Sequence, residues 1–291
     1  MDRIQELLKH ITKDQRGIEI GPYHNPLAPR RLGFNSLAVD VFDTEHLRRR
    51  AEADPNIPRD HLAHVEEVDL VGSAVDIADL VRDRFGEDRF DYVLSSHNFE
   101  HLPDPIRFLQ GCEQILKPGA VLTMAIPDRR YCFDFYRPVT ELSEWLDAFH
   151  DRRAKPTPGQ VFRHEAMQSI LDGQIAWSSR NTVMPAPLER LETAFADWQE
   201  LTQANGTAAY RDAHCSAFTP ASFELLLADL RYLGLTQFEV MEISGPNGCE
   251  FYAHLRNPSG YAYRLERPDF YRRRADIMKR AAIEAVCPVG A

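Results

Sequence analysis

The sequence has no long apolar run and no excess of basic charge, and each absence excludes a class of protein. No segment approaches the roughly 18 consecutive apolar residues of a membrane span. The 34 lysines and arginines are outnumbered by 44 aspartates and glutamates, which gives a net charge of -10. Because nucleic acids bind to densely basic surfaces, this balance predicts no nucleic-acid partner. We therefore expect neither a membrane span nor nucleic-acid binding.

Paired cysteines are also absent. The five cysteines form no CxxC pair, which fits reduced thiols and supplies no zinc knuckle. Residues 1–7 lack the apolar core of a signal peptide. We therefore expect a cytoplasmic protein without a metal site. The cysteines are Cys112, Cys132, Cys215, Cys249 and Cys287.

Short apolar runs alternate with helical patterns as far as residue 127. This alternation predicts a doubly wound, mainly parallel α/β sheet. Helices are expected over 4–11, 76–85 and 105–116, where apolar residues recur at helical spacing. The expected strands are 17–20, 36–41, 65–71, 90–96 and 121–126.

The pattern changes after Pro127. Residues 128–217 show no clear strand and are expected to form a mostly helical cap over the carboxyl edge of the sheet. The cap helices are predicted at 139–150, 160–176 and 187–203.

Alternation resumes at residue 218. A helix over 220–232 precedes two strands, 235–243 and 250–256, joined by a Gly-Pro-Asn-Gly turn that predicts an antiparallel hairpin. The sheet should then have seven strands. The predicted units are a sheet domain of 1–127 and 218–256, the 128–217 cap, and a basic helical tail of 257–291.

The loop after the first predicted strand lies where open α/β sheets bind ligands. It offers one glycine, Gly21, where dinucleotide sites have three. Asp40 ends the second strand 21 positions after Glu19, where a carboxylate can accept both hydrogens of a ribose diol. Asp40 could equally cap the next helix. The small residues at 72–74 would let an adenine ring approach the backbone.

Four stretches together resemble class I S-adenosylmethionine-dependent methyltransferases. They are residues 19–25, Asp40, residues 90–102 and residues 116–119. The last two resemble the family's "EH-L … LKPGG" signature, with Ala120 in place of the second glycine. The terminal hairpin matches the family's last two strands, the final one reversed. The Pro-Asp-Arg-Arg-Tyr run after strand five is similar to bacterial methyltransferases associated with glycan biosynthesis.

The resemblance implies a Rossmann-like fold and S-adenosylmethionine as cofactor. One departure is the loop, where Pro22 and His24 replace glycines and Pro22 has no N–H to donate. The implied cofactor contacts are Glu19, Gly21, Pro22 and Asn25 at the methionine portion, Asp40 at the ribose with Val41 beside the adenine, Ser73 and Ala74 along the adenine, and Ser95, Ser96 and His97 below the sulfonium.

Three histidines are candidate catalytic residues. Methyl transfer requires alignment of donor and acceptor, and a hydroxyl acceptor must also lose its proton. His97 follows strand four and is the first candidate base, although it could only contact the cofactor. His101, of the Glu-His pair, and His214, before the last sheet helix, are the others; His101 could be structural. Residues 97–101 also spell the HxxEH zinc-protease motif, which needs a continuous helix that the strand end and Pro103 do not favour.

The run after strand five supplies candidate acceptor contacts. Arginines can hold a phosphate or carboxylate, and aromatic rings can stack on a sugar. The same side chains could instead anchor the cap. The candidates are Arg129, Arg130, Tyr131 and Arg137, with His164 from the cap.

The sequence thus predicts methylation of an oxygen on a sugar or sugar-containing precursor. Two alternatives stay open: a methyltransferase for an amine or carboxylate acceptor, and a non-catalytic methyltransferase-like binding protein. The expected partner is a small-molecule or glycan acceptor. The basic tail is a candidate subunit contact, so the chain could form a homo-oligomer.

Overall fold

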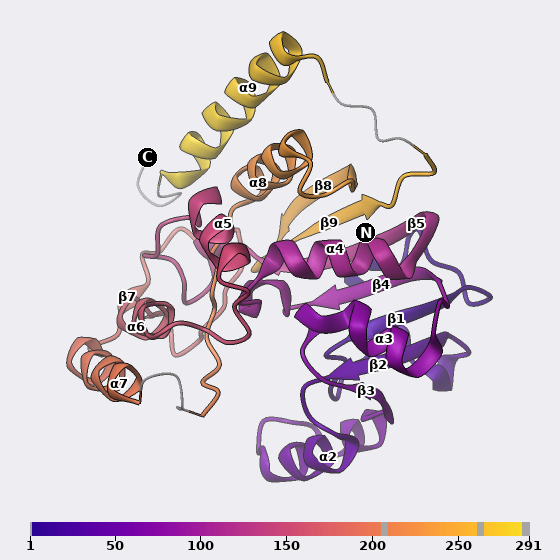
Figure 1. Cartoon of the computed structure of the whole chain (residues 1–291). Helices are drawn as coiled ribbons and strands as arrows, with labels where there is room; N and C mark the ends of the chain where they lie inside the picture. The colour runs from indigo at the N-terminus through magenta and orange to yellow at the C-terminus, as the bar shows by residue number, and fades with distance from the viewer. Residues whose placement is uncertain (1, 205–208, 261–264, 287–291) are drawn as a thin grey trace.

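The computed structural model describes residues 2–204, 209–260 and 265–286. Its centre is a seven-stranded sheet in the order β3-β2-β1-β4-β5-β9-β8 (Figure 1). β9 runs antiparallel to both of its neighbours, and the other pairs are parallel. This confirms the predicted sheet and its terminal hairpin. The strands are β1 Arg16–Ile20, β2 Asn35–Asp40, β3 Val68–Val71, β4 Phe90–Ser96, β5 Leu116–Pro127, β8 Glu239–Asn247 and β9 Glu250–Arg256.

Apolar side chains cover both faces of the sheet because successive strand residues point to opposite sides. Val93 joins the larger cluster with α3, α4 and α8, whereas Tyr92 and Leu94 join the second cluster with α1. The 21–34 link, rich in proline, contains only the short 3-10 turn Arg30–Leu32. The helices are α1 Arg3–Leu7, α2 Thr44–Ala53, α3 Ile77–Phe85, α4 Pro105–Ile115 and α8 Pro220–Leu233.

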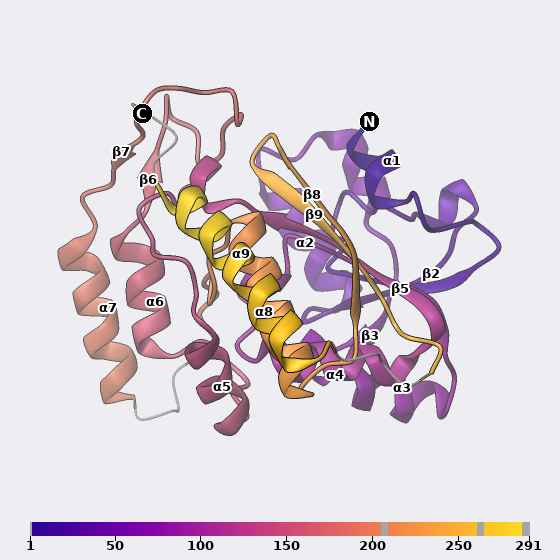
Figure 2. The ribbon, with the colours of Figure 1, turned by 90° about the horizontal axis from the view of Figure 1, so that it is seen from above.

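The predicted cap segment contains α5 (Leu142–His150), α6 (Pro158–Ala166) and α7 (Leu191–Gln203), with α6 and α7 side by side in Figures 1 and 2. The prediction of a helix over 160–176 was wrong beyond Ala166. There Ser169 donates its N–H to the Phe133 carbonyl (3.0 Å), and β6 (Ser169–Ile170) pairs with β7 (Ala186–Pro187). The expectation of no strand in the cap was therefore also wrong.

Other boundaries also differ from the prediction: β5 begins at Leu116 rather than 121, β8 at Glu239 rather than 235, and α7 at Leu191 rather than 187. The first helix ends at Leu7, and β3 begins at Val68 because residues 59–64 form a 3-10 turn just before it. β8 continues to Asn247, so the Gly-Pro pair lies inside the strand and the hairpin turns at 248–249. These shifts leave the strand order unchanged.

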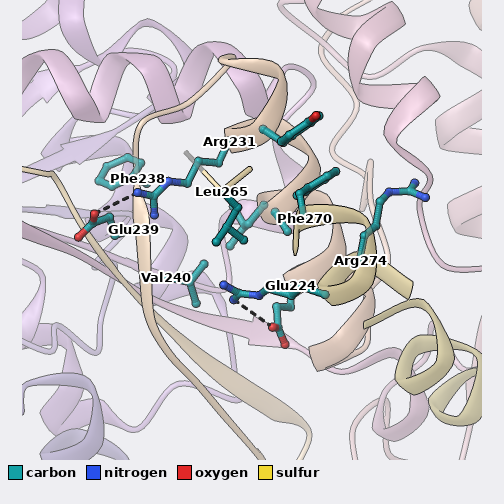
Figure 3. Close-up of a pocket in the computed structure, with 12 residues that line it drawn as sticks. Glu224, Arg231, Phe238, Glu239, Val240, Leu265, Phe270 and Arg274 are labelled. Atoms are coloured by element: carbon teal, nitrogen blue, oxygen red, sulfur yellow. Dashed lines mark hydrogen bonds and ion pairs between the residues drawn. The ribbon is translucent and has the colours of Figure 1, made fainter. Parts of the chain in front are cut away.

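The basic tail forms α9 (Arg267–Ala285), which packs against α8. Arg274 pairs with Asp229 at 2.8 Å, and the rings of Tyr232 and Phe270 stack with centroids 3.7 Å apart. A cavity of about 250 Å³ lies between α8, α9 and the amino end of β8 (Figure 3). Residues 261–264 and 287–291 of the tail, including Cys287, lie outside the described residues. Across the described ranges, no helix is both long and apolar enough to cross a bilayer.

A close contact between neighbouring strands gives a test of the sheet. A Cβ atom on Gly17 would lie 2.1 Å from the ring of Tyr92, which crosses it from β4. We expect Gly17→Ala to lower the free energy of unfolding by roughly 1–3 kcal/mol, the usual cost of overpacking. Urea denaturation monitored by circular dichroism measures this free energy. Gly159→Ala in α6, where the nearest atom is 4.0 Å away, is the control and should not destabilise the protein. Equal midpoints for both variants would contradict the packing described.

Candidate functional site

The carboxyl ends of β1, β2 and β4 surround a cavity of about 400 Å³, within the range of small-molecule sites. β1 lies between the other two strands, with Ile20 opposite both Val39 and Ser95. Gly21 then turns the chain with φ of 62°, a conformation that favours glycine. The loop, Asp40 and His97 therefore meet at one edge of the sheet.

Asp40 lies on the cavity wall, as the ribose prediction requires. Its Oδ1 accepts the Phe42 N–H at 2.9 Å, and burial raises the pKa of the carboxyl group. Val41, half exposed, and Phe42 continue the wall. The Arg50 guanidinium lies 5.9 Å from the Phe42 ring centroid, a cation–π distance. A carboxylate beside apolar and aromatic surface suits a ribose joined to a flat base.

Some of the residues predicted to contact the adenine and the sulfonium line the cavity, and others lie behind its wall. Gly72 and Ala74 line the cavity, whereas the Ser73 hydroxyl accepts the Val75 N–H at 3.3 Å. Ser96 lines the cavity, and Ser95 is buried behind it, within 3.3 Å of the Asn98 amide.

The loop after β1 separates this cavity from a second hollow of about 320 Å³. Pro22 and Asn25 line the second hollow, and Gly21 and His97 line both. Glu19 is buried, and its carboxylate accepts the N–H groups of Leu27 (2.6 Å) and Ala28 (2.9 Å). Burial raises the pKa of Glu19 to about 7. Glu19 thus fixes the shape of the loop through these two hydrogen bonds.

His97 is held in an unusual backbone conformation directly after β4. Its φ is 49°, and its ring donates Nε2–H to Glu250 at 2.7 Å. Glu250 also binds Arg3 at 2.7 Å. Burial alone would lower the pKa of His97, but the hydrogen bond to Glu250 raises it. For Glu250 the balance is reversed: burial would raise its pKa, but His97 and Arg3 lower it to about 2. The His97 side chain remains 40% exposed.

The cap contributes two residues to the cavity that the sequence did not indicate. Tyr210 and Asp212 line it together with Asp40 and Gly21. Asp212 accepts the Nδ1–H of His101 at 2.9 Å and the hydroxyl of Tyr210 at 3.2 Å. Burial would raise the pKa of Asp212, but the bond from His101 lowers it to about 2. His101 is therefore at the cavity wall, bound to the cap.

His214 and Arg137 are buried within the cap, His164 lies partly buried beside His214, and none of the three lines the cavity. His214 donates Nδ1–H to Asp134, which also accepts from Arg137 at 2.7 Å. Burial alone would raise the pKa of Asp134, but His214 and Arg137 beside it hold that pKa well below its usual range. His164 accepts the backbone N–H of His214 at 3.1 Å, and burial, with the charge of His214, lowers its pKa to about 4.

Arg129 and Arg130 lie at a separate hollow of about 210 Å³, beside Tyr136 and the end of α9. Arg130 pairs with Asp128 at 2.5 Å, and the neighbouring Tyr131 is buried. None of the five residues predicted to contact the acceptor therefore lines the Asp40 cavity, as far as the described residues define it.

The HxxEH run does not lie on one helix. His97 follows the strand end, and Phe99–His101 forms a single 3-10 turn. This agrees with the expectation that the run is not a zinc-protease helix.

Comparison with known proteins identifies the family. Residues 1–232 match the sequence profile of a methyltransferase domain, so the chain belongs to that family. No curated protein matches significantly. The doubly wound sheet described above is the fold that the sequence predicted for an S-adenosylmethionine-dependent methyltransferase. The enzyme class and the expected cofactor are thereby confirmed.

Solved structures with a similar fold are distant in sequence. One is a methyltransferase from Thermotoga maritima described as a possible histamine N-methyltransferase (15% identity, 87% of each chain covered, TM-score 0.41). Another is a methyltransferase from Methanosarcina mazei (14%, 89% of this chain and 99% of that one, TM-score 0.42). A third is the CcbJ methyltransferase from Streptomyces caelestis (14%, 87% and 93%, TM-score 0.40). The acceptor must be inferred from this chain's own residues.

Neutralising Asp40 tests the cofactor assignment. A hydrogen bond to a charged group contributes about 1.5–3 kcal/mol, so Asp40→Asn should weaken S-adenosylhomocysteine binding roughly 10- to 100-fold. Isothermal titration calorimetry measures the affinity. Glu45→Gln, which removes a carboxylate from nearby α2 outside the cavity, is the matched control and should bind normally. Unchanged affinity in Asp40→Asn would place the ribose elsewhere.

Proposed function

We propose that the enzyme transfers the methyl group of S-adenosylmethionine to a hydroxyl oxygen of a sugar or sugar-containing precursor. One observation carries this proposal: a single cavity is lined by the cofactor residues Gly21 and Asp40 and by Tyr210 and Asp212 from the cap. In this proposal the sheet domain, 1–127 with 218–256, binds the cofactor, and the 128–217 cap supplies the acceptor side.

The acceptor side of the cavity is polar and includes an aromatic ring. Tyr210 is 51% exposed, so its ring can lie against the apolar face of a sugar. Asp212 can accept hydrogen bonds from sugar hydroxyls. This combination favours a polyhydroxylated acceptor, and it agrees with the similarity of the Pro-Asp-Arg-Arg-Tyr run to methyltransferases associated with glycans.

Each residue then has a defined task. The bound cofactor supplies an activated methyl group on its sulfonium. Asp40 holds the ribose, and the Gly21 loop positions the methionine portion. His97 receives the proton of the acceptor hydroxyl, with Glu250 fixing the orientation of its ring at 2.7 Å. Most of the rate gain comes from holding donor and acceptor in line.

An amine acceptor is the second candidate, because the ionised Asp212 on the wall would attract an ammonium group. Methyl-labelled cofactor incubated with sugars, nucleotide sugars, amines and carboxylic acids separates the candidates. Labelled sugar ether supports the proposal, whereas labelled amine or ester would replace it. Cofactor binding with no labelled product from any class would favour a non-catalytic binding protein.

Replacement of His97 tests its role. We choose His97→Asn because asparagine tolerates the positive φ at this position. Loss of a general base should lower kcat about 10²- to 10⁴-fold and leave S-adenosylhomocysteine affinity within a few-fold of wild type. Steady-state kinetics with the acceptor found in the screen, together with calorimetry, measure both.

The control for this variant is His150→Gln, at the exposed end of α5. It should retain wild-type kcat and affinity. A His97→Asn enzyme with normal kcat would remove His97 from the chemistry, and one that loses cofactor affinity instead would make it a binding residue.

A further inference from the structure

A buried carboxylate without a hydrogen-bond partner lies among three histidines where the sheet meets the cap. Glu100 is 1% exposed, and neither of its carboxylate oxygens accepts a hydrogen bond from the described residues. Its Oε1 lies 3.7 Å from Nε2 of His101, 3.9 Å from Nε2 of His214 and 3.8 Å from Nδ1 of His97, whose Nε2 is engaged by Glu250. These separations are too long for hydrogen bonds. Burying a carboxylate in this way is costly unless a cation balances it.

Two of these histidines are oriented with the same nitrogen toward Glu100. His101 donates Nδ1–H to Asp212, and His214 donates Nδ1–H to Asp134. In a neutral ring, this tautomer leaves the lone pair on Nε2, which is the atom nearest Glu100. A carboxylate that binds the far nitrogen of a histidine is the arrangement that orients metal-binding histidines in proteins.

The fold brings these groups to a separation close to that of metal ligands. Ser216 donates its N–H to the Glu100 carbonyl at 3.0 Å, which fixes the chain around His214 beside the turn. The three potential ligand atoms lie within 4.8 Å of one another. Bonds of about 2.0–2.1 Å in a tetrahedral zinc site would place such atoms about 3.3 Å apart. Completing the site would require the two Glu100–histidine separations to shorten by roughly half an ångström and the two histidine nitrogens to approach each other as well.

We infer that Glu100, His101 and His214 bind a divalent transition-metal ion. Two imidazole nitrogens and one carboxylate suit zinc or ferrous iron, whereas magnesium and calcium prefer oxygen ligands. Three protein ligands leave at least one coordination position for water or another molecule. Glu100 and His101 belong to the HxxEH run, but the third ligand is His214 from the far end of the cap, so the site differs from that of a zinc protease.

A second group of potential ligands, Asp134, His164 and His214, is less suited to bind an ion. Asp134 is already engaged by Arg137 and by Nδ1 of His214. His164 uses its Nδ1 to accept the backbone N–H of His214. These residues support His214, and Glu100 is the group whose oxygens are without partners.

The metal would lie next to the proposed acceptor side, because His101 also lines the Asp40 cavity. A bound cation lowers the pKa of a hydroxyl that coordinates it, which would assist methylation of an oxygen. This role, unlike the binding itself, rests on the proposed function.

Direct titration with zinc tests the site without the cofactor. Protein freed of metal with a chelator should bind one equivalent of Zn²⁺ by calorimetry. Asp212→Asn should weaken binding about 10- to 100-fold, as loss of such outer carboxylates typically does. Glu100→Gln, which removes a ligand, should weaken it further. Zinc should raise the thermal midpoint of the wild type more than that of Glu100→Gln.

The matched control is His61→Gln, from the surface group in which the His24 and His61 rings lie near each other. It should bind zinc as the wild type does. If His61→Gln no longer binds the equivalent of Zn²⁺, or if the wild-type protein binds no Zn²⁺, the inferred site is wrong. If circular dichroism shows that Glu100→Gln does not fold, the variant of the exposed Asp212 decides the test.

A parallel titration with S-adenosylhomocysteine separates this inference from the proposed function. If the protein binds S-adenosylhomocysteine but no zinc, the metal site is wrong and the proposed function stands. Zinc binding that depends on Glu100 and Asp212 supports the metal site, even if no cofactor binds and the proposed function fails.

Discussion

The parallel pairing of β1 with β4 is the constraint on which the site depends. It sets Ile20 opposite Ser95, so the two chains leave the sheet side by side as the Gly21 loop and as His97. β2 pairs on the other side of β1 and delivers Asp40 to the same edge. A slip of one residue would exchange the two faces of the strand and expose its apolar side chains. The burial of the strand therefore fixes the edge that carries the Gly21 loop, Asp40 and His97 as well as the core.

The cap is joined to this edge by apolar packing, in which Trp145 contacts Phe99, and by charged and polar groups, several of them buried. Glu100 and His101 of the sheet side meet His214 and Asp212, and Asp134 joins His214 to Arg137. Breaking such buried pairs is costly, so they favour one arrangement of the cap over others. Glu100 is the exception, since its oxygens lack partners among the described residues. A metal ion at that point would link the attachment of the cap to the chemistry of the cavity.

Patterns along the chain predicted the sheet and the edge at which Asp40 and His97 lie, because both follow from strand ends. β4 was predicted with its observed bounds, since its buried run is flanked by polar residues, and Asp40 and His97 lie at strand ends as expected. Tyr210 and Glu250 carried no local signal, because only the return of the chain brings them to the cavity and to His97. Within the cap, pairing with Phe133 overrode the helical pattern beyond Ala166.

The central claim is that the cavity beside Asp40 holds the cofactor with its reactive end toward His97 and the cap. A crystal structure of the complex with S-adenosylhomocysteine tests it most directly. The account predicts ribose hydroxyls within hydrogen-bond distance of the Asp40 carboxylate and the sulfur on the side of His97. A nucleoside bound elsewhere, or in this cavity with its sulfur directed away from His97, would contradict it.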